Sequence, residues 1–249
     1  MSRLFFLVAC LAASLFTLES AQAGVGKISS PEVKKNEFEV EYSGIRTSDD
    51  SASGNNKQSH TLEMEYGFTD RLMLGLETKE ERSAASGSKL SGYGIEGQYQ
   101  FTKQGDWWLA SAIKAEYLHA AHDADADEAE AKLLLARTEH KFKTIVNISL
   151  ERELGSHRDP GVALSSAVQA TYACDKHFTP GIEWHGDYGM LNDLNRSGAR
   201  EHYVGPILTG ELFELGSGEI GYTAGYYWGL TGHSTDHAAR LQIGYETAF

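Results

Sequence analysis

The sequence has few cysteines and few basic residues, and each scarcity excludes a class of protein. Its two cysteines are Cys10 and Cys174, and the first lies in a segment that we expect to be removed. A single remaining thiol allows no disulfide framework and no cysteine metal site. Lysine and arginine number 22 against 35 aspartates and glutamates, which gives a formal net charge of −13. Nucleic-acid binding requires basic surface, so no nucleic-acid partner is expected.

Long apolar runs are also lacking. A mean hydropathy of −0.37 excludes a membrane protein built from helices. The one apolar run, residues 4–16, is too short to cross a bilayer as a helix. It follows Arg3 and precedes the small-residue pattern of residues 21–23, which predicts a signal peptide at residues 1–23. A lipoprotein-like box ending at Cys10 is the alternative, but it lies too near the start of the chain.

Proline is scarce and glycine abundant, at 4 and 26 residues, as expected of many strands and turns. Alternation of apolar and polar side chains predicts strands. Residues 24–35 carry Gly, Ser, Pro and Lys and predict an extended periplasmic tail. Beyond it, one domain at residues 36–249 is expected to contain twelve strands, at 36–46, 59–68, 71–81, 89–101, 107–119, 128–142, 144–154, 162–173, 181–190, 201–213, 219–230 and 236–249. The register near Leu133–Leu135 is open, and Pro206 predicts a bulge or a weak point.

The last predicted strand alternates an apolar face with a polar one and ends on Phe249. This ending resembles the closing strand of bacterial outer-membrane β-barrels. The resemblance implies that Tyr245 and Phe249 form part of the C-terminal signal for the barrel-assembly machinery. Residues 181–184, 202–212 and 225–232 are also similar to a group of proteobacterial barrels without assigned activity. That similarity implies location and fold, and it transfers no site residues.

The fold class predicted is all-β: a closed antiparallel up-and-down transmembrane barrel of about 12 strands. Alternation alone does not distinguish it from a soluble barrel with an apolar interior. An export signal, a terminal Phe249, alternately short and long connections, and aromatic residues near the strand ends favour the membrane. The expected location is the bacterial outer membrane, with the long connections outside and with lipids and lipopolysaccharide as partners.

In this register the polar faces of the strands line the lumen. The residues that we expect to line it are Glu37, Glu39, Glu41, Glu63, Glu65, Glu77, Glu96, Glu116, Glu151, Glu183, Asp187, Arg240 and Glu246. Carboxylates that surround a pore concentrate cations and repel anions. The sequence therefore predicts a small, porin-like, cation-preferring diffusion channel for cationic or neutral solutes, without a cofactor. The alternative is a wall braced by cross-strand Glu–Lys and Glu–Arg pairs, with no open pore.

Two other functions are kept as alternatives. His119, His122, Asp123 and Asp125 lie near one expected extracellular loop and are weak candidates for a transition-metal site, because imidazole and carboxylate suit Zn²⁺ or Cu²⁺. No pair spacing fixes a geometry there, so a surface or structural barrel with metal-binding loops is the first alternative. A lipid hydrolase is the second alternative. No spacing in the sequence forces a serine and a histidine together, so we expect that the protein is not an enzyme.

Overall fold

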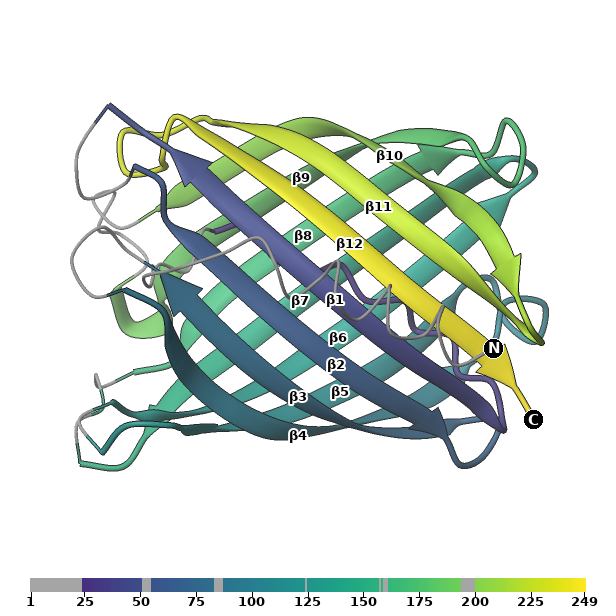
Figure 1. The fold of residues 1–249 in the computed structure, drawn as a ribbon, viewed down its shortest axis with the longest axis horizontal. Helices are drawn as coiled ribbons and strands as arrows, with labels where there is room; N and C mark the ends of the chain where they lie inside the picture. Colours follow the sequence, from purple (N-terminus) through teal and green to yellow (C-terminus); the bar gives the residue numbers. More distant parts are fainter. Residues whose placement is uncertain are drawn as a thin grey trace.

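The computed structural model describes residues 24–50, 55–82, 87–123, 125–156, 158, 161–193 and 200–249. These residues form one β-barrel (Figure 1). The predicted signal peptide, residues 1–23, lies outside the described residues and stays a prediction. Among the described residues, no helix has the length and apolarity needed to cross a membrane.

The twelve predicted strands all form, with ends that differ from the expected ones by a few residues. They are β1 (Glu37–Ser48), β2 (Gln58–Gly67), β3 (Leu72–Arg82), β4 (Lys89–Thr102), β5 (Ala110–Ala120), β6 (Asp127–Glu139), β7 (Phe142–Leu154), β8 (Ala163–Tyr172), β9 (Thr179–Met190), β10 (Glu201–Leu215), β11 (Gly218–Gly229) and β12 (His237–Ala248). A short 3-10 helix, η1 (Leu191–Asp193), follows β9. Strands of this length suffice to cross the hydrocarbon layer when tilted.

Each strand pairs antiparallel with its sequence neighbours, and β1 pairs with β12 to close the barrel. The closed up-and-down architecture predicted from the alternation is confirmed. Asn36 and Phe249 lie at one end of the barrel, which we call the short-turn end because brief turns connect the strands there. The opposite end, on the left of Figure 1, is the long-loop end.

The two faces of the wall differ as a membrane barrel requires. Leu76 and Ile95, on β3 and β4, are 60% and 61% exposed on the outer face. On the inner face of β4, Glu96, Gln98 and Gln100 are almost completely buried. Apolar side chains outside and polar ones inside are the reverse of a soluble barrel. The structure therefore selects the transmembrane interpretation of the alternating pattern.

Two uncertain registers are resolved. On β6, Leu134 is completely buried and faces inward, whereas Leu133 is exposed on the outer face. On β10, Pro206 keeps its pairing with Ile182, and no register shift occurs there. The β-bulge lies instead between Glu211 and Phe213. Pro206 faces outward. The pairing of β10 with β11 is interrupted beside it and resumes in the same register at Ile207, so the proline is tolerated.

Aromatic side chains lie near both ends of the outer face. The sequence predicts aromatic residues near the strand ends, and exposed examples there are Phe68, Phe101, Trp107, Phe213 and Trp228. The sequence pattern predicts a strand that begins at Trp107. In the structure β5 begins at Ala110, so Trp107 lies before the strand. Aromatic rings at these heights match the interfacial belts of membrane proteins.

Candidate functional site

The inner wall carries a series of glutamates on neighbouring strands, interrupted at Gly75 on β3. Cross-strand pairing places in one line Glu246, Glu39, Glu65, Gly75, Glu96, Glu116, Glu130 and Glu151, from β12 through β1 to β7. We call this line the carboxylate row. Because barrel strands are tilted, a line perpendicular to them climbs along the barrel axis. The row therefore winds from near the short-turn end, at Glu246, toward the long-loop end, at Glu151.

The predicted lumen residues all lie on inner faces of their strands. Glu63, Glu77, Glu96, Glu183 and Arg240 are nearly or completely buried there. The remaining members are half-buried and alternate with outward-facing neighbours, namely Glu37, Glu39, Glu41, Glu65, Glu116, Glu151, Asp187 and Glu246. Cross-strand pairing adds a shorter second line beside the carboxylate row, formed by Glu41, Glu63 and Glu77.

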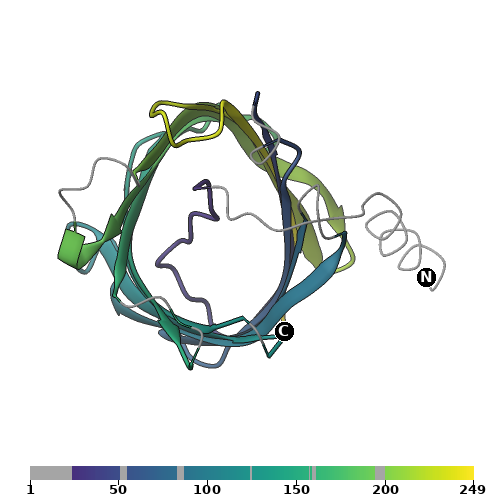
Figure 2. The ribbon, with the colours of Figure 1, turned by 90° about the vertical axis from the view of Figure 1, so that its left-hand side faces the viewer.

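The lumen is not empty, because residues 24–35 run through it. We call this segment the inner strap; Figure 2 shows it inside the ring of strands. Val25 is completely buried near the long-loop end, and Asn36 joins β1 at the short-turn end. The sequence predicts an extended periplasmic tail here, and the structure differs: the segment is extended but lies within the barrel.

Side-chain amides of the wall explain why the inner strap can lie there. Asn147 accepts a hydrogen bond from the Ser29 backbone N–H at 2.8 Å and donates one to the Ser29 carbonyl at 2.9 Å. Gln98 donates to the Ser30 carbonyl, and Gln100 accepts from the Val33 N–H, both at 3.1 Å. Backbone groups taken from water need such partners. The wall therefore supplies them in place of a neighbouring strand.

The first ionic contact of the inner strap is made by Lys27. Its ammonium contacts Glu63, lies 3.1 Å from Glu41 Oε1 and lies 3.9 Å from Glu65 Oε1. Lys114 of β5, which is almost completely buried, lies 3.2 Å from Glu65 and 2.6 Å from Glu96. We call Glu41, Glu63, Glu65 and Glu96 the acidic cluster. Gly75 separates Glu65 from Glu96, and a Cβ there would meet Glu96 Oε1 at 2.5 Å, so glycine leaves room for the Glu96 carboxylate to cross β3.

A second polar centre surrounds Glu183 on β9. Its carboxylate accepts hydrogen bonds from Arg240 at 2.7 Å, from Tyr227 at 2.6 Å and from Gln169 at 2.7 Å. His185 Nε2 lies 3.0 Å from the same carboxylate. Both the Glu183 and Arg240 side chains are inaccessible to solvent. A buried ion pair persists when its remaining hydrogen-bonding groups are satisfied, as they are here for Glu183.

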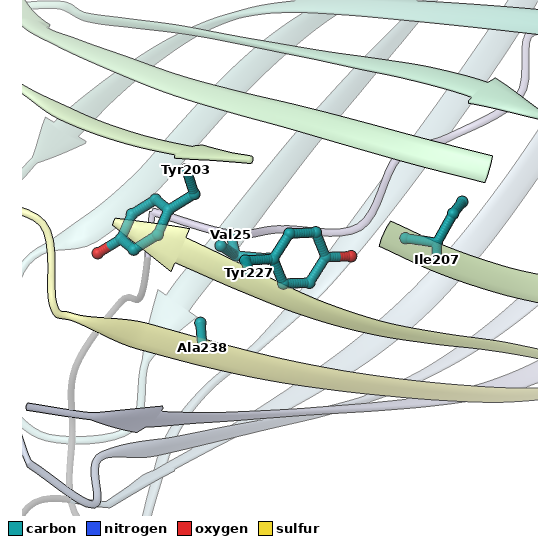
Figure 3. Packing of buried hydrophobic residues seen from close by; sticks show 5 residues of the cluster. All are labelled: Val25, Tyr203, Ile207, Tyr227 and Ala238. Carbon is teal, nitrogen blue, oxygen red and sulfur yellow. The ribbon is translucent and has the colours of Figure 1, made fainter. Parts of the chain in front are cut away.

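The start of the inner strap packs directly on this centre. Arg240 also donates to the Gly26 carbonyl. Val25 forms a small apolar cluster with Tyr203, Ile207, Tyr227 and Ala238, shown in Figure 3. The strap is thus held at its start by apolar packing and by the arginine of β12.

At the short-turn end, Lys34 attaches the inner strap to the first and last strands. Its ammonium lies 2.8 Å from Glu37 and 2.5 Å from Glu246. Burial lowers the pKa of Lys34, but hydrogen bonds to Glu246 and Glu37 raise it by more, and the net pKa lies above its ordinary value. Because the pKa is raised, this contribution to stability is present at neutral pH and is lost only as the pH rises through the lysine range.

A cavity of about 210 Å³ remains between the inner strap and the wall. Its lining includes Lys27, Val33, Glu39, Glu65 and Lys114. The acidic cluster therefore borders open space on one side while Lys27 contacts it from the strap.

The metal candidates of the long-loop end are not brought together. His119 lies on the outer face, where its ring nitrogen is 2.8 Å from Asp127, and His122, Asp123 and Asp125 are exposed. Within the described ranges, the group compatible with a metal ion is Glu63, Glu65 and Glu96. The serine hydroxyls whose partners lie among the described residues include Ser111, Ser166 and Ser217, and each of these three pairs with another hydroxyl.

The inner strap is the part of the site that sequence reasoning missed. Its composition resembles a linker, and its three apolar residues, Val25, Ile28 and Val33, do not follow the alternation that predicts a strand. The inward amides Gln98, Gln100 and Asn147 were the available indication, because they are neutral in a wall otherwise dominated by carboxylates.

No protein-family model and no curated protein sequence matches the chain. Its fold resembles that of solved structures. The COG4313 outer membrane channel from Pseudomonas putida F1 has a TM-score of 0.64 at 13% identity, over 90% of this chain and 100% of that one. The NanC porin has a TM-score of 0.55 at 9% identity, over 84% of this chain and 100% of that one.

The KdgM porin in complex with disordered oligogalacturonate has a TM-score of 0.53 at 9% identity, over 85% of this chain and 99% of that one. These likenesses establish the fold as that of small bacterial outer-membrane barrels, which confirms the predicted fold. Together with the apolar outer face, they agree with the outer membrane as the location of the chain.

Proposed function

We propose that the chain forms a small porin-like channel in the outer membrane, that it prefers cations, and that the inner strap obstructs its lumen. The observation that supports this most directly is the carboxylate row, which extends along the wall from one end of the barrel toward the other. Closely spaced carboxylates in a confined space raise the local concentration of cations.

The wall has fewer cations than carboxylates. The inward-facing cations that pair with it are Lys79, Lys114, Lys132 and Arg240. These pairs brace the wall, as the non-channel alternative requires, but they leave members of the row such as Glu39 and Glu116 in excess. An oligogalacturonate, the ligand in the KdgM complex, is a polyanion that this acidic wall would repel. We therefore assign this chain cationic or neutral solutes.

The experiment that tests the proposal is conductance across a planar bilayer under a KCl gradient. The wild-type chain is compared with a variant that lacks residues 24–34, both refolded and shown to be heat-modifiable. We expect small or infrequent current steps from the wild type and larger steps from the variant, with a cation-selective reversal potential. Glu77→Gln with Glu116→Gln should shift that potential toward zero, since both residues lie away from the contacts of the strap.

The possible failures separate the parts of the proposal. Silence from both folded proteins would refute the channel. An anion-selective reversal potential would refute the assignment of cations. Equal conductance with and without the strap would show that the strap does not obstruct passage.

A further inference from the structure

We propose that the acidic cluster is a binding site for solutes that carry primary ammonium groups, and that Lys27 occupies it as a tethered substitute for such a solute. This inference rests on the proposed channel function and names its substrate class. The site comprises Glu41, Glu63, Glu65 and Glu96, with Lys114 as its fixed wall cation.

The geometry around Lys27 is that of ammonium recognition. An ammonium group has three N–H donors and no acceptor. The Lys27 ammonium has three carboxylates around it, from Glu41 on β1 and from Glu63 and Glu65 on β2. Its side chain is 19% exposed, and it belongs to a segment with no strand partner. The position is therefore filled by a group that can leave without unfolding the wall.

The cluster also has unused acceptor capacity. Glu96 is 4% exposed, its carboxyl lies against that of Glu65, and its Oε1 meets no donor among the described residues. Glu77 lies beside Glu63 in the register and is 6% exposed; its carboxyl lies against that of Glu116, and its Oε1 likewise meets no donor within the described ranges. Buried carboxylate oxygens without donors are costly. A solute with two amines would satisfy more of them than the single ammonium of Lys27 does.

The arrangement favours an amine over a divalent metal ion. Oxygens of Glu63, Glu65 and Glu96 lie close enough together to hold an ion. However, the Lys114 ammonium already lies 3.2 Å from Glu65 and 2.6 Å from Glu96. A metal ion bound by these two carboxylates would lie against a buried positive charge. The Lys27 position is farther along the cluster and borders the cavity of about 210 Å³, which gives a small solute room to enter.

Because Lys27 is part of the chain, it competes with a free amine for the acidic cluster. A group on a short flexible segment acts at an effective concentration on the order of millimolar, so a free amine binds weakly until Lys27 is removed. Lys27→Gln should therefore bind 1,4-diaminobutane about tenfold more tightly than the wild type does, as measured by isothermal titration calorimetry in detergent. Lys35→Gln, an exposed lysine of the same strap, is the matched control and should leave the affinity unchanged.

Several outcomes would overturn the inference. The first is that Lys27→Gln binds the diamine no more tightly than the wild type. The second is that tetramethylammonium, which has no N–H donor, binds as tightly as the diamine, which would indicate general attraction of cations. The third is that Ca²⁺ binds more tightly than the diamine and loses its affinity in Glu96→Gln, which would indicate a metal site. Adding Glu63→Gln to Lys27→Gln should weaken diamine binding, and unchanged binding would also contradict the assignment.

A second measurement uses the wild-type chain, in case Lys27→Gln does not fold. If the diamine displaces Lys27, trypsin should cleave after Lys27 faster when 1,4-diaminobutane is present, and tetramethylammonium should have no such effect. An unchanged cleavage rate would count against the inference. Because binding and cleavage require no ion flow, a silent bilayer with measurable diamine binding would refute the channel alone.

Discussion

At the scale of single residues, Glu183 joins several polar side chains of the wall. It accepts from Arg240, Tyr227 and Gln169, and its side chain and that of Arg240 are inaccessible to solvent. Glu183→Ala would leave the Arg240 guanidinium buried without its carboxylate, and removal of one partner of such a pair costs about 3–5 kcal/mol. We expect a loss of that size in the free energy of unfolding, followed by tryptophan fluorescence in urea.

The matched control for this change is Glu214→Ala. Glu214 pairs with Lys176, but its side chain is 76% exposed. Exposed ion pairs contribute about 0–1 kcal/mol. If the two variants lost equal stability, the Glu183 centre would not be the buried pair that the geometry describes.

Gly67 is the residue that tests how the inner strap is positioned. A Cβ at this inward position would lie 1.9 Å from the Lys34 carbonyl oxygen, so Gly67→Ala must displace the strap or the wall. Overpacking of this kind costs about 1–3 kcal/mol. The strap should move before the wall does, because it has no strand partner. If the whole cost falls on the strap, the fraction of molecules in which the strap has left its place on the wall should rise roughly 5- to 150-fold.

The measurement is again the rate of trypsin cleavage after Lys27, which should rise in Gly67→Ala while the urea midpoint of the barrel changes little. Gly232→Ala is the control, because a Cβ there meets no atom within 4 Å. Slow cleavage in both variants would mean that the wall absorbs the added methyl group and that the strap is not the weaker element.

At the scale of elements, the strands could be predicted and the inner strap could not. A strand such as β11 alternates without interruption, and the side-chain period of two fixes which residues face inward. The strap has no such period, since its contacts come from a wall that exists only after the barrel closes. The sequence predicts a bulge or a weak point at Pro206, whereas the bulge lies between Glu211 and Phe213. Proline removes a backbone donor, but at the outward position of Pro206 the strand register does not shift.

The candidate site divides in the same way. The inward positions of Glu63, Glu65 and Glu96 follow from alternation. Their approach to one another does not, because it depends on Gly75 lying between β2 and β4 in the register. The Lys27 contacts depend on the strap and were beyond any local pattern.

At the scale of the whole molecule, a twelve-stranded barrel is wide enough to enclose more than its own side chains. The chain fills part of that space with its own inner strap, held at the start by Val25 and Arg240, in the middle by Lys27 and at its end by Lys34. The wall around it remains acidic. Under the proposed function this segment obstructs the lumen without belonging to the wall, so its removal should affect conductance more than folding.

The membrane orientation of the wall makes a prediction of its own. Leu76 lies in the middle of β3 on the outer face and is 60% exposed, whereas Leu90 lies at the long-loop end of β4 and is 46% exposed. An arginine facing lipid costs about 2–4 kcal/mol at the bilayer midplane and about 0–1 kcal/mol near the interface. Leu76→Arg should therefore destabilise the barrel in liposomes by the larger amount and Leu90→Arg by the smaller, as measured by urea unfolding. Equal effects of the two arginines would place the apolar face outside the hydrocarbon layer and would refute the transmembrane interpretation.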